Sequence, residues 1–206
     1  MPKKPNRPKN LKLGPEVSRR GFLRGLGAAA GAAAVGAPLL GARQESRVQG
    51  PGPVKVALQI NGARREVEIE PRVTLLNALR NHLDLTGTKK ICDRGSCGGC
   101  MVLVDGAAVN SCLMLAIDAE GRKIETIEGL SADGKLHPIQ EEFCAHDALQ
   151  CGFCTPGMVM ACKALLDRKK EPTLDEIREG ISGNICRCGT YNKIFDAVRA
   201  AAPRLK

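Results

Sequence analysis

Aromatic side chains, histidines and nucleotide-binding glycine motifs are scarce in this chain, and each shortage excludes a class of function. The 206 residues include four Phe, one Tyr and no Trp, too few rings to stack on the bases of a nucleic acid. No G-x-G-x-x-G sequence is present, so a flavin dinucleotide would have to be bound by another chain. The three histidines, His82, His137 and His146, lack the spacing of a metal site or a nucleophile–base pair. We therefore expect a chain that converts no substrate by itself and binds no nucleic acid.

Positive charge is concentrated at the N-terminus. Residues 1–24 contain eight Lys or Arg and one Glu, which accounts for +7 of the net charge of +9. The next eighteen residues, 25–42, are uncharged and contain eight Ala and five Gly. A basic region, an apolar stretch and a small-residue end are typical of a secretion signal. Arg19-Arg20-Gly21-Phe22-Leu23 resembles the twin-arginine export signal, so the sequence predicts such a signal in residues 1–42, the twin-arginine export machinery as a partner, and a periplasmic protein.

Two other interpretations of this segment compete with an export signal. Eighteen apolar residues reach the lower limit of a membrane span, but Ala and Gly are weakly hydrophobic and Pro38 interrupts the stretch. A basic tail could bind nucleic acid, but an uncharged stretch directly behind it favours a signal. Without residues 1–42 the formal net charge falls to +2, so no large basic face remains. Residues 43–53 are polar and contain Gly and Pro, which predicts a linker.

The chain contains ten cysteines, and the first four form a compact group in the sequence. Cys92, Cys97 and Cys100 have the spacing C-x4-C-x2-C, and Cys112 follows after eleven residues. Thiolates this close in sequence converge on one centre. The spacing of the first three matches the plant-type [2Fe–2S] loop. Gly95, Gly98 and Gly99 would let the loop adopt positive φ and direct backbone N–H groups to the sulfurs.

A second group has a different shape. Cys151 and Cys154 form a C-x2-C pair, and Cys186 and Cys188 form a C-x-C pair about thirty residues later. Two close pairs of thiolates can hold one four-ligand metal centre. The remaining Cys144 and Cys162 are predicted to be small buried hydrophobic residues on helices.

Disulfides and structural zinc are the alternatives to iron–sulfur. An exported protein meets an oxidising compartment, but Cys186 and Cys188 are separated by one residue, and a disulfide between them would be strained. Twin-arginine signals carry folded cargo, so metal can be inserted before export. Four-cysteine zinc sites use C-x2-C pairs, for which C-x4-C-x2-C and C-x-C are poor spacings. Iron–sulfur is the favoured interpretation.

The mature part divides by pattern into a strand-rich and a helical half. Alternating apolar residues in 54–60 and 67–69, on either side of Asn61-Gly62, predict a hairpin. Thr74 is predicted to cap a helix. Strands are expected in 101–104, then up to 109 after a turn at Asp105-Gly106, and in 123–127. Helices are predicted in 138–149, from Pro156 with Thr155 as N-cap, from the capping box at Thr173, and in 191–202. The fold class is therefore α+β, with an N-terminal β-grasp domain in 54–129 and a small four-helix bundle in 130–206.

Together these motifs resemble a known family. The C-x4-C-x2-C loop with Cys112, the run Gln150-Cys151-Gly152-Phe153-Cys154-Thr155-Pro156-Gly157, and Gly183-Asn184-Ile185-Cys186-Arg187-Cys188-Gly189-Thr190-Tyr191 are similar to the two-cluster iron–sulfur subunit of the xanthine oxidase and aldehyde oxidoreductase family of molybdenum hydroxylases. The similarity covers nearly all of residues 54–200. That family has a plant ferredoxin-like β-grasp domain followed by a four-helix domain, which agrees with the pattern above.

The resemblance also implies roles. It implies two [2Fe–2S] clusters, one held by Cys92, Cys97, Cys100 and Cys112 and one by Cys151, Cys154, Cys186 and Cys188. A separate large subunit would hold molybdopterin, often as the cytosine dinucleotide, and hydroxylate an aldehyde or an N-heterocycle. The helical-domain cluster would lie nearest this cofactor, with Gln150 and Cys188 approaching the pterin. The other cluster would pass electrons to an FAD subunit or to another acceptor such as a cytochrome.

Two functions remain open on the sequence. The first is the electron-transfer subunit of an exported molybdenum-containing hydroxylase or dehydrogenase. The alternative is a free-standing two-cluster electron carrier. A free carrier needs no second domain shaped to approach a pterin, so the helical half favours the first.

Overall fold

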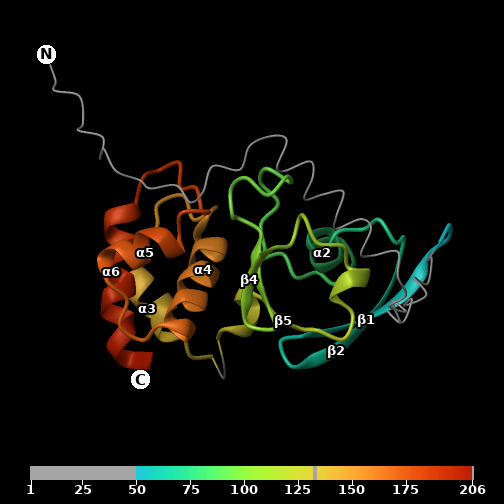
Figure 1. Cartoon of the computed structure of the whole chain (residues 1–206), viewed down its shortest axis with the longest axis horizontal. Coiled ribbons are helices and arrows are strands. Elements are labelled where there is room, and N and C mark those ends of the chain that lie inside the picture. The colour runs from blue at the N-terminus through green and yellow to red at the C-terminus, as the bar shows by residue number, and fades with distance from the viewer. Residues whose placement is uncertain (1–49, 132–133, 206) are drawn as a thin grey trace, which may run out of the picture. The chain divides into compact units, whose positions relative to one another are not determined.

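The computed structural model describes residues 50–131 and 134–205; the predicted signal in residues 1–42 lies outside the described residues. The strands precede the four longer helices along the chain (Figure 1). The strands are β1 (Val54–Ile60), β2 (Ala63–Ile69), β3 (Met101–Val104), β4 (Ala107–Asn110) and β5 (Lys123–Glu125). The helices named in the argument below are α2 (Leu75–Asn77), the π-helix η1 (Ala78–His82), the 3-10 helix η3 (Ile127–Gly129), α3 (Pro138–Ala145), α4 (Thr155–Arg168), α5 (Leu174–Gly180) and α6 (Tyr191–Ala201).

Two tight turns set the register of the sheet. Asn61 and Gly62 both have positive φ, 51° and 80°, as do Asp105 and Gly106, 51° and 80°. Two-residue turns of this kind match the twist of antiparallel strands. The first joins β1 to β2, with Ile60 opposite Ala63, and the second joins β3 to β4. Both turns were predicted from the sequence and are confirmed.

The sheet is mixed. Its strand order is β2-β1-β5-β3-β4, with β1 and β5 parallel and the other neighbours antiparallel. The alternation in β1 buries Val56, Leu58 and Ile60 on one face. There they pack with Leu75 and Leu79 of the short helical segment α2–η1. The oxygen Oγ1 of Thr74 accepts a hydrogen bond from the Asn77 N–H at 3.3 Å, so the predicted cap is confirmed.

The longer helices share a second core that also reaches the sheet. Helix α4 is central and buries nine residues, and Leu103 of β3 belongs to the same buried cluster as the helical side chains. Lys163 of α4 lies 3.3 Å from the Glu125 carboxylate of β5 and 2.6 Å from that of Asp167. Val48–Lys206 belong to one compact unit, and the predicted domain boundary between residues 129 and 130 stays a prediction.

The predicted strands and helices are present, but some of them begin or end at other residues than predicted. Helix α3 stops at Ala145, four residues early, and Asp147 just beyond it has a positive φ of 48°. Strand β5 stops at Glu125, and a 3-10 turn follows. Thr155 is not the N-cap of α4; Cys154 occupies that position, without a side-chain cap, and Thr155 is already helical. The capping box at Thr173 is confirmed, with the hydroxyl and the Glu176 carboxylate bonding each other's backbone N–H. The α+β class is confirmed by the mixed sheet and the helices.

Among residues 50–131 and 134–205, no helix combines the length and the hydropathy that a membrane crossing requires.

Candidate metal centres

The β3–β4 hairpin brings the first cysteine group together. Cys92 and Cys97 lie in the irregular loop before β3, Cys100 ends that loop, and Cys112 follows β4. Because the hairpin is antiparallel, its two open ends meet: Ser111 donates to the Cys100 carbonyl from its backbone N–H (3.3 Å) and from Oγ (2.7 Å). Cys100 and Cys112 are buried beside Leu76, whereas Cys92 and Cys97 are half-buried.

Two of the three loop glycines behave as predicted. Gly95 has a φ of 75° and donates its N–H to the Cys112 sulfur at 3.2 Å. Gly98 has a φ of 67°. The expectation of a positive φ is wrong for Gly99. An added Cβ at Gly99 would lie 2.2 Å from Cδ1 of Ile91, an exposed side chain that could move aside.

The four sulfurs of this group form two close pairs. The Cys92 thiol contacts the Cys97 thiol, and the Cys112 thiol contacts the Cys100 thiol. The N–H of Arg94, followed by the Cys97 contact, lowers the pKa of Cys92 to about 7. Burial, followed by the Cys100 contact, raises the pKa of Cys112 to about 11.

The second group lies on the two loops that lead into α4 and α6. Cys151 and Cys154 precede α4, and Cys186 and Cys188 precede α6. Here too the sulfurs are paired, Cys151 with Cys188 and Cys154 with Cys186. Burial raises the pKa of Cys154 to about 12. Burial opposes ionisation of Cys186 as well, but hydrogen bonds from Thr190, whose Oγ1 lies 3.3 Å from the sulfur, lower its pKa to about 7.

A two-metal core fits this arrangement better than a single ion. All ten cysteines are free thiols. A [2Fe–2S] core is wider than one ion and takes two cysteine thiolates on each iron. Each group offers two pairs of sulfurs, which is the donor set that such a core requires.

The other predicted residues have mixed outcomes. Gln150 and Cys188 are exposed, so both side chains are accessible to another chain; their approach to a pterin stays a prediction. Cys162 is fully buried on α4, and burial raises its pKa, as expected of a structural cysteine. The same expectation is wrong for Cys144, which is exposed on α3.

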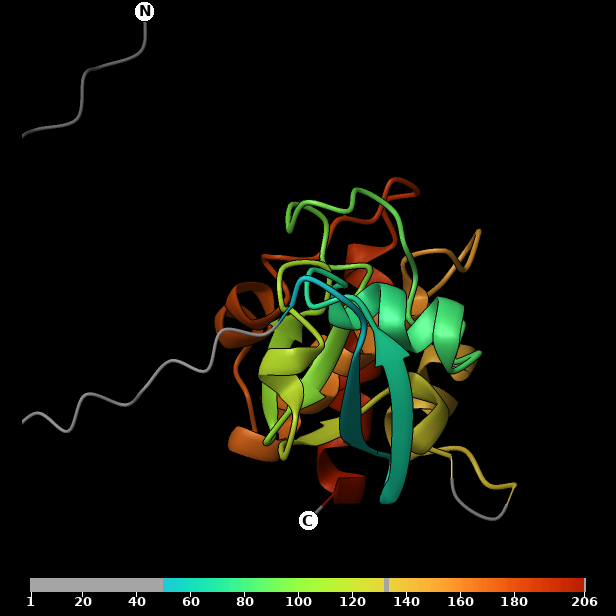
Figure 2. The same cartoon turned by 90° about the vertical axis from the view of Figure 1, so that its right-hand side faces the viewer.

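The sequence interpretation missed the residues that join the two groups. The cysteine-bearing loops lie at the same end of the described part of the chain (Figure 2). Ile185 donates its N–H to the Cys97 carbonyl at 3.0 Å, and the Asn184 side chain donates to the Gly98 carbonyl at 3.1 Å. Tyr191 bonds the backbone on both sides of Ile185. All three residues belong to the run around Cys186 that carries the family resemblance, but the sequence interpretation assigned them no role.

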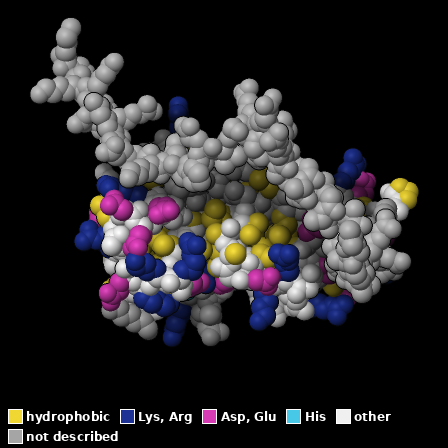
Figure 3. Space-filling model, in the orientation of Figure 1, with side chains coloured by type: hydrophobic (Ala, Val, Ile, Leu, Met, Phe, Trp, Pro, Cys, Tyr) yellow, Lys and Arg dark blue, Asp and Glu magenta, His cyan; other side chains and the backbone are white. Residues whose placement is uncertain are grey.

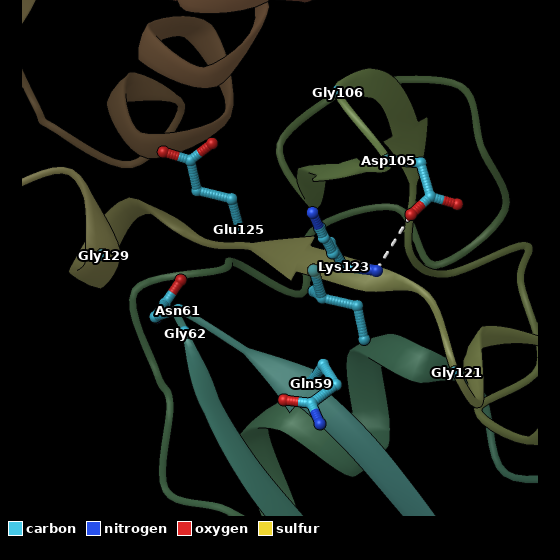
Figure 4. A pocket seen from close by; sticks show the side chains of 10 residues that line it. Gln59, Asn61, Gly62, Asp105, Gly106, Gly121, Lys123, Glu125 and Gly129 are labelled. Carbon is cyan, nitrogen blue, oxygen red and sulfur yellow. Dashed lines mark hydrogen bonds between the residues drawn. The ribbon is translucent and has the colours of Figure 1, made fainter.

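An open cavity of about 690 Å³ lies away from the cysteines. Figure 4 shows that its lining comes from the ends of the strands, with Gln59, Asn61 and Lys123 around it and the Lys123 N–H bonded to Asp105 at 2.9 Å. None of the ten cysteines lines it. On the face seen in Figure 3, acidic and basic side chains interleave around a central band of hydrophobic ones, and no broad region of that face is basic alone.

Comparison with known proteins agrees with this geometry. Residues 58–131 match the model of the 2Fe-2S iron-sulfur cluster binding domain, and residues 126–199 match that of the [2Fe-2S] binding domain. The aldehyde oxidoreductase iron-sulfur-binding subunit PaoA of Escherichia coli O157:H7 is 42% identical over 92% of this chain and 90% of its own. The nicotine 6-hydroxylase small subunit of Paenarthrobacter nicotinovorans is 50% identical over 70% of this chain and 87% of its own.

A solved structure is similar over most of the chain. A chain of quinoline 2-oxidoreductase from Pseudomonas putida 86 superimposes with a TM-score of 0.72 and 47% identity, covering 74% of this chain and 96% of that one. Two cluster-binding domain matches, together with relatives of these lengths and identities, show the family. The chain belongs to the iron–sulfur subunits of the molybdenum hydroxylase family of oxidoreductases, and its function is that of an electron-transfer subunit.

Proposed function

We propose that the eight paired cysteines are the ligands of two [2Fe–2S] clusters. Cys92, Cys97, Cys100 and Cys112 hold one, and Cys151, Cys154, Cys186 and Cys188 hold the other. The observation that carries this assignment is the convergence of each group: Cys100 and Cys112 are buried together beside Leu76, and the second four lie on the two loops that lead into α4 and α6. When bound, such a cluster accepts and releases single electrons.

The residues around the sulfurs suit this task. Once the thiolates carry charge, donors such as the Gly95 N–H at 3.2 Å stabilise the sulfurs, and hydrogen bonding of this kind tunes the potential of a cluster. Cys154 is the N-cap of α4, a helix of fourteen residues. The positive end of that helix dipole favours negative charge there. The larger architecture that we propose is a ferredoxin-like β-grasp domain in residues 54–129 followed by a four-helix bundle in 130–206.

The partner that we propose for the second group is a large subunit carrying molybdopterin, often found as the cytosine dinucleotide. Gln150 and Cys188 are exposed at the edge of this group, which supports their predicted approach to the pterin. Electrons then leave through the first group to an FAD subunit or to another acceptor such as a cytochrome. The chain by itself converts no substrate.

For the substrate of the whole complex we propose an aldehyde in preference to an N-heterocycle. The aldehyde oxidoreductase subunit aligns with 92% of this chain, whereas the nicotine hydroxylase subunit aligns with 70%. An alignment over 92% of 206 residues must extend into residues 1–49. Reduction of the purified complex by aromatic and aliphatic aldehydes, but not by nicotine or quinoline, is the expected result. Reduction by the heterocycles alone would contradict this choice.

We further propose that residues 1–42 direct export of the assembled complex to the periplasm. The paired Arg19 and Arg20 before an uncharged stretch support this. Changing both to Lys should keep this chain and its large subunit in the cytoplasm, as followed by fractionation and immunoblotting. The matched control changes Lys3 and Lys4 to Arg, which preserves charge outside the motif. Export of the large subunit in the Arg19/Arg20 variant would refute this proposal.

The cluster assignment is tested by metal analysis of anaerobically purified complex. We expect about four irons per chain of this type, two distinct electron paramagnetic resonance signals after reduction, and co-purification of a larger chain with molybdenum. Cys154→Ser should remove one signal and about half of the iron, whereas Cys162→Ala, a change of a cysteine outside both groups, should keep both signals. Zinc or disulfides in place of iron would contradict the assignment.

A further inference from the structure

The two cysteine groups are joined directly through backbone. The N–H of Ile185 donates to the carbonyl of Cys97 at 3.0 Å. Cys97 belongs to the first group, and Ile185 is the residue before Cys186 of the second. Starting at the Cys97 sulfur, a path along covalent bonds to its carbonyl, across this one hydrogen bond and along the chain to the Cys186 sulfur contains no gap through space.

The Asn184 side chain links the two loop segments that form this junction. It is only 4% exposed, and its Nδ2 donates to the Gly98 carbonyl at 3.1 Å. Its Oδ1 has no hydrogen-bond partner among the described residues, so its contribution to the junction comes through Nδ2. The neighbouring bonds, Asn184 to Gly98 and Ile185 to Cys97, thus run side by side between the same two loops.

Tyr191 fixes the same segment from the other side. Its hydroxyl accepts the N–H of Cys186 at 2.8 Å and donates to the carbonyl of Asn184 at 3.1 Å. The residues before and after Ile185 are therefore both held by one side chain from the first turn of α6. With Asn184 bound to Gly98, the direction of the Ile185 N–H is set from both ends.

We propose that Asn184 is a positioning residue for electron transfer between the two cysteine groups, because it holds the Ile185–Cys97 hydrogen bond closed. This inference rests on the proposed function, in which each group binds a cluster. Bonded atoms couple two redox centres more strongly than a gap of equal length. The step itself moves one electron, so that one centre is oxidised as the other is reduced, and no bond or proton changes place.

The test uses the iron-loaded full chain and the variant Asn184→Ala. Loss of one hydrogen bond to a buried carbonyl should lower the exchange protection of the Ile185 amide by about tenfold. Single electrons delivered by pulse radiolysis should then redistribute between the centres severalfold more slowly, with both reduction potentials unchanged. Tyr191→Phe removes the hydroxyl but keeps the ring, so it should also lower the exchange protection of the Ile185 amide and slow electron redistribution. This variant replaces Asn184→Ala as the test if Asn184→Ala does not fold.

The matched control is Lys163→Met. It breaks the Lys163–Glu125 ion pair, another contact between α4 and the sheet, but leaves the Ile185 junction intact. It should lower the thermal midpoint without slowing electron redistribution. If the Asn184 variant loses amide protection but transfers electrons at the unaltered rate, or if Lys163→Met slows transfer equally, the inference is refuted. Absence of iron from the unaltered chain would instead refute the proposed function, so the two failures are distinguishable.

Discussion

Helix propensity and tertiary packing make opposite predictions for Gly157→Ala, which makes this substitution a sharp test of the structure. Gly157 lies in the first turn of α4, where Ala would stabilise an isolated helix by about 1 kcal/mol. An added Cβ would, however, lie 2.2 Å from the Gly98 carbonyl oxygen and 2.9 Å from Cα and the carbonyl carbon of Gly99. These are backbone atoms of the first cysteine loop, which cannot rotate away as a flexible side chain can.

The expected result follows from the larger of the two effects. Forcing one extra carbon into a closely packed site costs about 1–3 kcal/mol, and a backbone neighbour places this site at the upper end. After the gain in helix propensity, we expect a net loss of about 2 kcal/mol, which corresponds to a thermal midpoint roughly 4–8 °C lower for a domain of this size. The α4–loop contact must open, so the amide protection of Ile185 should fall as well.

The assay is thermal unfolding of the iron-loaded chain, followed by circular dichroism and by loss of the visible iron–sulfur absorption. Gly183→Ala is the matched control, because nothing lies within 4 Å of an added Cβ there and its φ is not positive. That control should unfold near the midpoint of the unaltered chain. A Gly157→Ala chain as stable as the unaltered one, or more stable, would refute the close approach of α4 to the first cysteine loop.

Two further predictions concern single side chains. Cys144 is exposed and Cys162 is fully buried, so iodoacetamide should label Cys144 but not Cys162 in the iron-loaded chain. Mass mapping reads this out, and rapid labelling of Cys162 in the folded chain would contradict it. The pKa of Glu176 is lowered to about 2 by Lys169, followed by the N–H and hydroxyl of Thr173. A carboxyl group with a lowered pKa stabilises the folded chain above its unfolded pKa, and this stabilisation is lost as the pH falls through its folded pKa. The urea midpoint of the unaltered chain should therefore exceed that of Glu176→Gln fully above about pH 5, and the difference should vanish near about pH 2. A pH-independent difference between the two would argue against this ion pair.

Local sequence signals were enough for most elements and for the candidate ligands. The turns at Asn61-Gly62 and Asp105-Gly106 need only a positive φ at two adjacent residues, and the capping box at Thr173 needs only a partner three residues later. The grouping of the cysteines likewise follows from short spacings. The same spacings favoured iron–sulfur over zinc or disulfides, and the resemblance to the molybdenum hydroxylase family implied the partners.

What only the tertiary structure decided involves residues far apart in the chain. Packing of α4 on β3 brings Gly157 against Gly98 and places Asn184 and Ile185 on the first cysteine loop. No local periodicity encodes such contacts, since they depend on where the two cores meet. The exposure of Cys144 has the same origin. The sequence alone thus indicated which cysteines are candidate ligands and determined which segments form turns and helices, while packing between the two cores decided how the two cysteine groups are joined.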